Sequence, residues 1–280
     1  MKKISRRSFL AAAAVSAAAL ALTACGGSAS TASSAAASSV AASSEAASTS
    51  AAAAELTTVE AGKLTMATNA TFPPYEMTTD SGEIEGIDVD TAKAIAEKLG
   101  LELQIDDMDF DAALLSVQQG KADIVMAGVT VTDERKAVMD FSDSYATGIQ
   151  SIIVPEGSDI ASPDDLAGKK IGTQRGTTGY IYCSDDFGDD AVVAYDDGLT
   201  AVQALKNGQV DAVVIDNAPA EEYVAANPGL VILDTSYAEE DYAIGMAKGS
   251  ALEDAVNAAL EELKADGTLQ SIVDKYITAE

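Results

Sequence analysis

The 280-residue chain contains no histidine and no tryptophan, and only two cysteines, Cys25 and Cys183. Without histidine it cannot form a Ser-His-Asp triad, a zinc site with imidazole ligands, or a site that uses imidazole as acid or base. We therefore expect no metal and no cofactor, and any catalysis would depend on carboxylates, Lys, Tyr or hydroxyl groups. With Cys25 in an N-terminal leader, no disulfide is expected within the folded part, where Cys183 is predicted to be a packing residue.

Basic residues are scarce as well. The 17 Lys and Arg stand against 45 Asp and Glu, for a formal net charge of −28. Affinity for nucleic acid comes largely from clustered Lys and Arg, so a nucleic-acid partner is excluded. The hydrophobic content of 48% includes many alanines outside any expected core and does not indicate a membrane protein.

Residues 1–25 have the features of an export signal. Four basic residues precede a 14-residue, mostly apolar run, Phe9–Leu22, which is shorter than the ~20 residues needed to span a bilayer. The segment LTAC at 22–25 resembles a bacterial lipobox, which implies cleavage before Cys25 and lipid on its sulfur. A buried or disulfide-bonded Cys25 is the alternative. The paired arginines fit a twin-arginine signal or an ordinary basic leader.

A tether separates this leader from the folded part. Residues 26–55 are mainly Ala and Ser and cannot bury a core, so we expect a disordered spacer. Residues 56–280 are numerous enough for one large domain or for two lobes of roughly 100 residues each.

Short β-rich runs alternate with helical patterns in the folded part. Residues 88–99 carry apolar side chains at helical spacing, and a second such helix is predicted at 250–263, beginning with a capping box of Ser250 and Glu253. The alternation predicts an α/β fold with mainly parallel sheets. Strands are predicted at 63–68, 101–105, 122–128, 150–154, 169–173 and 210–216.

One pattern occurs twice. Segments 114–128 and 202–216 both run from helix to glycine, acidic residue and strand, with Asp123 aligned with Asp211. Two similar units predict two lobes of like construction. Ligands of open α/β sheets bind outside the carboxyl ends of the strands, so the residues that follow these two strands are candidates for a site.

Arg135 follows the first of these strands closely, and Asp216 ends the second. A guanidinium matches a carboxylate with two parallel hydrogen bonds, and a carboxylate matches an ammonium group. Facing each other across a cleft, the two side chains would hold both ends of a zwitterion. The alternative for Arg135 is a surface ion pair with its acidic neighbours in the sequence.

Seven collinear segments are similar to the polar amino-acid-binding proteins of bacterial ABC importers, solute-binding protein family 3. The resemblance covers 60–278 and implies a two-lobed, periplasmic-binding-protein-like α/β fold, in which each lobe is a sheet flanked by helices. The segments are TNATFPPYE (68–76), GIDVDTAKAIAEKLG (86–100), DFDA (109–112), TVTDER (130–135), DFSDSY (140–145), RGTT (175–178) and VDAVVID (210–216).

The resemblance implies how the two ends of the amino acid are held. Its α-carboxylate would bind Arg135, the backbone N–H of Thr130 and the loop Thr177–Thr178. Its α-ammonium would bind Asp216, with the Thr130 hydroxyl and the Gly128 carbonyl as further acceptors.

The resemblance also implies the pocket for the side chain. Phe72 and Phe110 would enclose it, with Tyr75 nearby and Asn69 at the far end. Core packing is the alternative for all three aromatic residues. Members that bind cationic side chains often have an acid where this chain has Asn69, which weakens an assignment to Lys or Arg. Arg175 could favour an acidic or amide side chain, or could form a solvated ion pair.

The family plan divides the chain into two lobes. The first would comprise 56–146 plus 246–280 and the second 147–245, joined by extended strands near 146–150 and 241–247. Closure of this hinge on a free L-amino acid would produce the form that an ABC permease with its ATPase recognises. We expect a monomer, exported and lipid-anchored on the outer face of the cytoplasmic membrane.

Two other functions remain open from the sequence. Exported cyclohexadienyl dehydratases use the same fold, and Glu76 is the one candidate acid or base for such chemistry that the motifs supply. A sensor module that passes ligand state to a signalling partner is the other alternative.

Overall fold

The computed structural model describes residues 56–277 of the chain. The predicted export signal at 1–25, its lipidated Cys25 and the tether at 26–55 lie outside the described residues.

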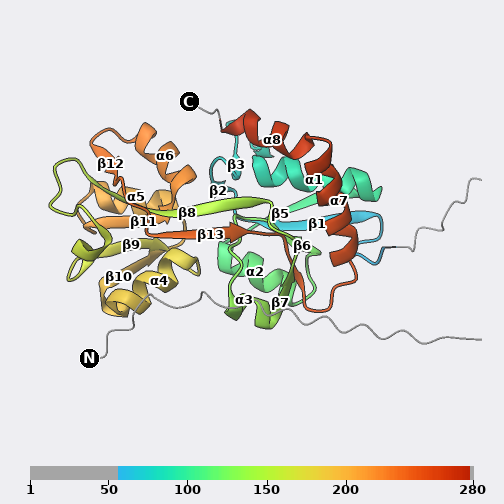
Figure 1. The fold of residues 1–280 in the computed structure, drawn as a ribbon, viewed down its shortest axis with the longest axis horizontal. Coiled ribbons are helices and arrows are strands. Elements are labelled where there is room, and N and C mark those ends of the chain that lie inside the picture. Colours follow the sequence, from blue (N-terminus) through green and yellow to red (C-terminus); the bar gives the residue numbers. More distant parts are fainter. Residues whose placement is uncertain (1–55, 278–280) are drawn as a thin grey trace, which may run out of the picture. The chain divides into compact units, whose positions relative to one another are not determined.

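The described part contains two large sheets, each with helices on both faces (Figure 1). The first sheet has the strand order β5-β1-β6-β14-β7. Its strands are β1 Lys63–Thr68, β5 Glu102–Asp107, β6 Ile124–Val125, β7 Met139–Phe141 and β14 Gly245–Ala247. The helices around it are α1 Ile87–Leu99, α2 Phe110–Gln118, α3 Asp133–Val138, α7 Glu253–Ala265 and α8 Thr268–Tyr276. A small sheet of β2 Thr71–Phe72, β3 Glu76–Thr78 and β4 Ile84–Glu85 lies beside α1. We call this assembly the first lobe.

The second sheet has the strand order β10-β9-β11-β8-β12, with β13 also paired to β8. Its strands are β8 Ala146–Pro155, β9 Ile171–Gln174, β10 Val192–Tyr195, β11 Ala212–Asp216, β12 Leu230–Ile232 and β13 Ala238–Tyr242. The helices α4 Thr178–Phe187, α5 Gly198–Lys206 and α6 Asn217–Ala226 surround it, together with short 3₁₀ turns at Pro163–Leu166 and Asp189–Ala191. We call this assembly the second lobe.

Both sheets are mixed, which corrects the expectation of mainly parallel sheets. In the first lobe β1 runs parallel to β5 and β6, whereas β14 is antiparallel to β6 and β7. In the second lobe β9 runs parallel to β10 and β11, whereas β8 is antiparallel to β11, β12 and β13. The helical crossovers give the parallel part, and the segments that pass between the lobes add the antiparallel strands.

Strands β8 and β13 run side by side between the two sheets (Figure 1). They pair antiparallel from Ala146 opposite Tyr242 to Gln150 opposite Ala238. At the first-lobe end the backbone N–H of Tyr145 continues the contact by donating to the Tyr242 carbonyl. The chain therefore crosses between lobes on two neighbouring extended segments.

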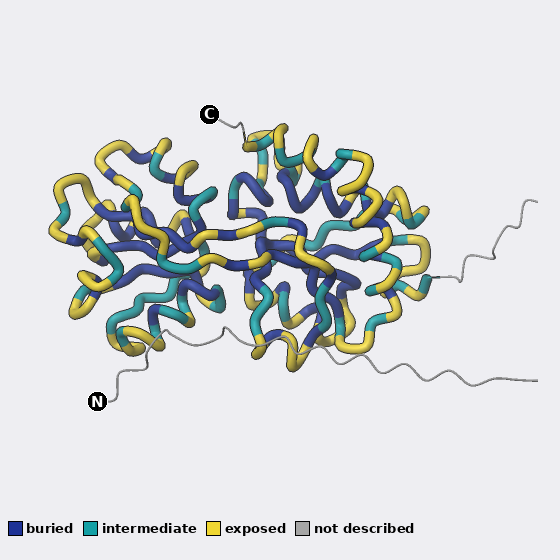
Figure 2. Tube along the Cα trace, viewed as in Figure 1, coloured by how far each residue is buried: buried dark blue, intermediate teal, exposed yellow. Residues whose placement is uncertain are grey.

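The buried residues lie in the strands and on the inner helix faces, and the outer faces are exposed (Figure 2). In α7 the buried residues Val256, Leu260 and Leu263 face α1, as their spacing predicts. The expected capping box is not formed, because α7 begins at Glu253, and the Ser250 hydroxyl instead accepts the Leu252 N–H at 3.2 Å. Cys183 is buried in the second lobe as a free thiol.

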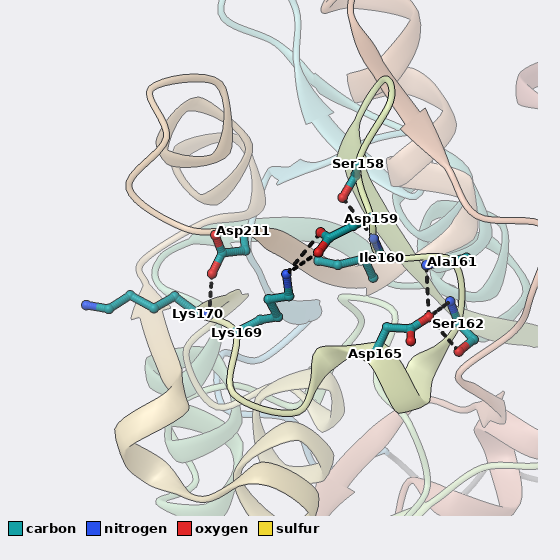
Figure 3. Close-up of polar contacts among 9 residues, drawn as sticks. All are labelled: Ser158, Asp159, Ile160, Ala161, Ser162, Asp165, Lys169, Lys170 and Asp211. Carbon is teal, nitrogen blue, oxygen red and sulfur yellow. Dashed lines mark hydrogen bonds and ion pairs between the residues drawn. The ribbon is translucent and has the colours of Figure 1, made fainter.

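The repeated sequence pattern is repeated in structure. In the first lobe the Asp123 carboxylate accepts the backbone N–H groups of Val59 at 2.7 Å and Thr65 at 2.8 Å. In the second lobe the Asp211 carboxylate accepts the N–H of Lys170 at 2.7 Å (Figure 3). Each aspartate thus ties its helix-to-strand turn to the start of the neighbouring parallel strand, β1 or β9. Asp123 is buried and Asp211 is exposed.

This difference in burial predicts different costs for the same substitution. Asp123→Ala should lower the free energy of unfolding by about 2–3 kcal/mol, because it leaves two backbone donors without an acceptor. Asp211→Ala should cost about 1 kcal/mol or less, since water can reach its single donor. Urea unfolding followed by circular dichroism measures both, and an equal loss in the two variants would contradict the prediction.

Candidate functional site

A small cavity between the two lobes is lined by side chains from both of them. Nine of the ten predicted ligand residues line it, and Tyr75 does not. From the first lobe the lining residues are Asn69, Phe72, Glu76, Phe110, Ala127, Gly128, Thr130 and Arg135; from the second lobe they are Gln150, Gln174, Thr177, Thr178, Ile215, Asp216 and Tyr242.

Arg135 is a buried cation in the first turn of α3. The Thr132 hydroxyl caps this helix by accepting the Arg135 N–H at 3.1 Å. The guanidinium donates to the Thr130 carbonyl at 2.7 Å and to the Gly176 carbonyl of the second lobe at 3.1 Å, and it lies 5.5 Å from the centre of the Phe110 ring. Burial lowers the pKa of Arg135, but a guanidinium remains protonated in proteins.

The alternative of a surface ion pair for Arg135 does not hold. The side chain is buried, and within residues 56–277 it forms no ion pair with its acidic neighbours in the sequence. Its two backbone hydrogen bonds leave further N–H groups of the guanidinium fork for a ligand carboxylate.

Asp216 is the buried anion on the other side. It ends β11 and caps α6, accepting the N–H of Ala218 at 3.1 Å and the N–H of Ile149 at 2.7 Å. Burial raises the pKa of Asp216 to about 6, while a hydrogen bond from Tyr242 and these two backbone donors hold it down. The carboxylate is therefore largely ionised at neutral pH and has lone pairs left for an ammonium group.

Glu240 of β13 orients the threonine hydroxyls, and the sequence motifs did not reveal it. Its carboxylate accepts from the Thr130 hydroxyl at 3.1 Å and from the Gln150 amide at 2.9 Å. Because the Thr130 proton is donated to Glu240, the lone pairs of this hydroxyl stay available to donors such as Thr178, 3.4 Å away. The alternation of exposed and buried residues along β13 is the signal that could have identified Glu240 as inward-facing.

Gly128 can only be glycine. Its φ of 56° lies in the left-handed region, and a Cβ atom there would lie 2.8 Å from a Phe72 ring carbon. Its backbone N–H donates to Asp88 at 2.9 Å. This contact fixes the turn between β6 and Thr130.

Tyr75 is the one predicted ligand residue that the structure moves away from the cavity. Its ring stacks on Phe72, with centroids 5.8 Å apart, and meets Tyr242 edge-on at 5.4 Å. Tyr75 therefore supports two lining aromatics from behind. This is the core-packing alternative.

Asn69 and Arg175 are both already occupied by protein partners. The Asn69 amide donates to the Met108 carbonyl at 3.0 Å, and its oxygen accepts from Gln174 of the second lobe at 2.8 Å. Arg175 is exposed, 3.5 Å from Asp196, and lies outside the cavity lining. Gln174, which no motif singled out, thus meets Asn69 across the cavity.

Glu76 and Asp88 form a buried carboxyl pair at the cavity wall. Glu76 lines the cavity with no solvent exposure, and no donor in residues 56–277 reaches either of its oxygens. Burial, followed by the charge of Asp88, raises the pKa of Glu76 well above its usual value. Burial likewise raises the pKa of Asp88 to about 6, although the hydrogen bond from the Gly128 N–H opposes this shift. The two carboxyls hydrogen-bond to each other only when one of them is protonated.

The sequence profile of the bacterial extracellular solute-binding proteins, family 3, matches residues 64–279. The chain belongs to this family.

Individual members of the family support the assignment. A probable histidine-binding protein of Neisseria gonorrhoeae is 35% identical over 222 residues, which cover 77% of this chain and 83% of that protein. The arginine-binding extracellular protein ArtP of Bacillus subtilis (strain 168) is 35% identical over 230 residues, 78% and 87% of the two chains. The solved structure of an ancestral arginine-binding protein bound to glutamine superposes with a TM-score of 0.74 at 44% identity, covering 78% of this chain and 99% of that one.

These comparisons confirm the predicted family and the two-lobed α/β fold of this solute-binding protein. The relatives are named as binding proteins. Within the described residues no helix is long and apolar enough to cross a membrane. The same part of the chain holds no group of three or more His, Cys, Asp or Glu side chains suited to a metal ion.

The buried carboxyl pair predicts a stability that depends on pH. Because the folded-state pKa of Glu76 is raised, the folded form binds a proton more tightly than the unfolded form, and stability falls as the pH rises above about 4.5. Glu76→Gln removes this penalty, so its melting temperature should exceed that of the wild type at pH 8, with a gain that shrinks toward pH 4.5. Each kcal/mol regained corresponds to roughly 2–4 °C.

The matched control is Glu97→Gln, on the exposed side of α1. Differential scanning calorimetry between pH 4.5 and pH 8 should show no such gain for the control. An unchanged or lower melting temperature of Glu76→Gln at pH 8 would show that the carboxylate is stabilised by a partner when it is ionised.

Proposed function

We propose that this solute-binding protein captures a free L-amino acid in the cavity between its lobes and delivers it to an ABC importer permease. The observation that carries the proposal is the placement of Arg135 and Asp216. These two buried, oppositely charged side chains come from different lobes and line one cavity. A zwitterion supplies the carboxylate that Arg135 lacks and the ammonium that Asp216 lacks.

Contacts between the lobes support closure around the ligand. Arg135 donates to the Gly176 carbonyl, and the Tyr223 hydroxyl of α6 donates to the Thr71 carbonyl of β2 at 2.5 Å. Two extended segments, β8 and β13, connect the lobes and would carry a hinge motion. We propose that the closed form is the one that the permease recognises.

The relatives favour a polar side chain in the ligand, since they are named for histidine and arginine, and one solved structure holds glutamine. We also propose a role without catalysis, because the relatives are named as binding proteins. Turnover of prephenate or arogenate by the purified protein would instead support the dehydratase alternative, with Glu76 as its acid or base. A gene neighbourhood without a permease and ATPase would favour the sensor.

The predicted location completes the proposal. Cleavage at the lipobox would leave lipid on Cys25, and residues 26–55 would tether a monomeric binding domain to the outer face of the cytoplasmic membrane. Metabolic labelling with a radioactive fatty acid, lost in Cys25→Ser, tests the anchor. The proposed lobe division, 56–146 with 246–280 and 147–245, places both crossings at the β8 and β13 segments.

Removing the guanidinium should abolish capture of all amino acids. Arg135→Ala should weaken the affinity for every bound amino acid by roughly 100-fold or more, because the ligand carboxylate would be buried without a partner. A thermal-shift screen with the common amino acids identifies the ligands, and isothermal titration calorimetry measures the affinities. Arg175→Ala, the control, removes an exposed arginine and should bind as the wild type does. Unchanged affinity in Arg135→Ala would overturn the proposal.

Closure predicts a second effect, at a contact between the lobes whose residues do not line the cavity. Tyr223→Phe removes a hydrogen bond made between the lobes and should weaken ligand affinity by about 3- to 10-fold. Tyr237→Phe removes a tyrosine hydrogen bond to Asp186 within the second lobe and should leave affinity unchanged. Titration calorimetry compares the two variants, and equal affinities would show that the Tyr223 contact is not linked to binding.

A further inference from the structure

Tyr242 is a buried residue of the cavity that the sequence motifs did not reveal. It ends β13, has 1% of its surface exposed, and lines the cavity together with Asp216. Its backbone pairs with Ala146 of β8, and its carbonyl accepts the N–H of Tyr145. Tyr242 therefore lies where the chain crosses between the lobes, and its side chain reaches the site.

The pairing of three strands places Tyr242 and Asp216 on one face of the second sheet. Tyr242 lies opposite Ala146, so its side chain is on the face of β8 that also presents Gly148 and Gln150. Gln150 in turn lies opposite Asp216 of β11. A side chain that extends from Tyr242 toward Asp216 on this face must cross β8 at Gly148.

Two glycines leave room for the Tyr242 ring. A Cβ atom at Gly148 would lie 2.5 Å from the ring carbon Cζ and 2.6 Å from the hydroxyl oxygen, and one at Gly128 would lie 3.2 Å from Cε2. Gly148 does not have a positive φ, so its backbone would accept another residue. The close approach of the Tyr242 ring is thus the reason for glycine at position 148.

Asp216 receives hydrogen bonds from three elements. The donors are the Ala218 N–H in α6, the Ile149 N–H in β8 and the Tyr242 hydroxyl in β13. Two of these donors, from Ile149 and Tyr242, therefore belong to the segments that connect the lobes. A binding group is held in its productive orientation when hydrogen bonds of this kind support it.

We propose that Tyr242 is a positioning residue for capture of the α-ammonium group, because its hydroxyl donates to Asp216 across β8 and keeps that carboxylate in place at the cavity. Gly148 provides the space that this contact requires. The inference rests on the proposed function and adds a residue that acts on the ligand through Asp216. Phenylalanine at position 242 would fill the same space and leave Asp216 with its two backbone donors.

The Tyr242 hydroxyl also affects when Asp216 takes up a proton. Burial raises the pKa of Asp216 to about 6, and the hydrogen bond from Tyr242 opposes this shift more than either backbone donor does. Without the hydroxyl the carboxylate is protonated at a higher pH, and a protonated Asp216 cannot pair with an ammonium group. The other titratable groups around Asp216, which a Tyr242 variant leaves in place, are Glu240 of β13, Tyr75 between β2 and β3, and Glu76 and Arg135 of the cavity lining.

The pH dependence of ligand affinity tests the inference. The probe is L-glutamine, whose uncharged side chain leaves only the α-groups to form ion pairs, and titration calorimetry covers pH 5.5 to pH 8. Tyr242→Phe should bind about 5- to 10-fold more weakly than the wild type at pH 6 and within about 3-fold at pH 8. The acidic limb of its affinity profile should move up by about one pH unit.

Gly148→Ala should move the acidic limb in the same direction, because its Cβ atom displaces the Tyr242 ring. Adding Tyr242→Phe to this variant should move the limb no further, since both changes remove one contact. The matched controls are Tyr237→Phe and Gly172→Ala, which change a tyrosine and a strand glycine of the second lobe outside the cavity lining. Both controls should follow the wild-type profile at every pH.

A second measurement requires no ligand. In protein labelled with carboxyl-¹³C aspartate, the Asp216 resonance is identified by its loss in Asp216→Asn. Its titration midpoint should lie at a higher pH in Tyr242→Phe than in the wild type. Circular dichroism verifies that each variant is folded, and Tyr242→Phe decides alone if Gly148→Ala does not fold.

Two results would overturn the inference. They are a Tyr242→Phe affinity profile that coincides with or runs parallel to that of the wild type, and an Asp216 resonance that titrates at the same pH in both. Either result would show that Tyr242 only fills space. If L-glutamine does not bind, the strongest ligand of the thermal-shift screen replaces it. If no amino acid binds, or if Arg135→Ala binds as the wild type does, the proposed function itself fails, while the NMR titration still tests the contact.

Discussion

The structure depends on two charged groups that are buried on opposite lobes and do not pair with each other. Removing Arg135 and Asp216 from water costs free energy, and buried charges in proteins are usually paired with an opposite charge. Here each group is held instead by neutral partners, carbonyl groups for Arg135 and backbone N–H groups for Asp216. Neither charge forms a salt bridge within residues 56–277, although the Glu240 carboxylate acts on Arg135 by its charge, so a dipolar ligand gains electrostatically in a site closed to water.

The fold places Arg135 and Asp216 at one cavity because each lobe contributes the end of a strand to it, β6 in the first lobe and β11 in the second. Each lobe contains the same helix-to-strand unit, tied by Asp123 or Asp211 to the neighbouring parallel strand. The strand of the first unit leads to the turn at Gly128, and the strand of the second ends at Asp216. The antiparallel pair of β8 and β13 joins the lobes and brings Glu240 beside the Thr130 hydroxyl. The two sheets thus position Arg135 and Asp216, and only the paired segments β8 and β13 connect the lobes within the described residues.

The acidic residues of this protein fall into two groups, one exposed at the surface and one buried around the cavity. Most carboxylates are exposed and account for the formal net charge of −28, which describes the surface. A few are buried around the cavity, where water does not screen them and where their pKa values rise. Because the chain has no histidine, Asp88 and Asp216, whose pKa values burial raises to about 6, are the carboxylates at the cavity placed to change charge near neutral pH.

The sequence by itself determined the α/β alternation, the paired units and the family, because hydrophobic periodicity and collinear motifs are local properties of the chain. It also located nine residues of the cavity, including Arg135 and Asp216. Only the tertiary structure decided that Tyr75 lies behind Phe72, that Gln174 meets Asn69 across the lobes, and that both sheets are mixed. These outcomes depend on pairing between residues far apart in the chain. The alternation along β13 indicates that Glu240 and Tyr242 share one face, but only the pairing of that strand with β8 and its position beside Thr130 decide what this face meets.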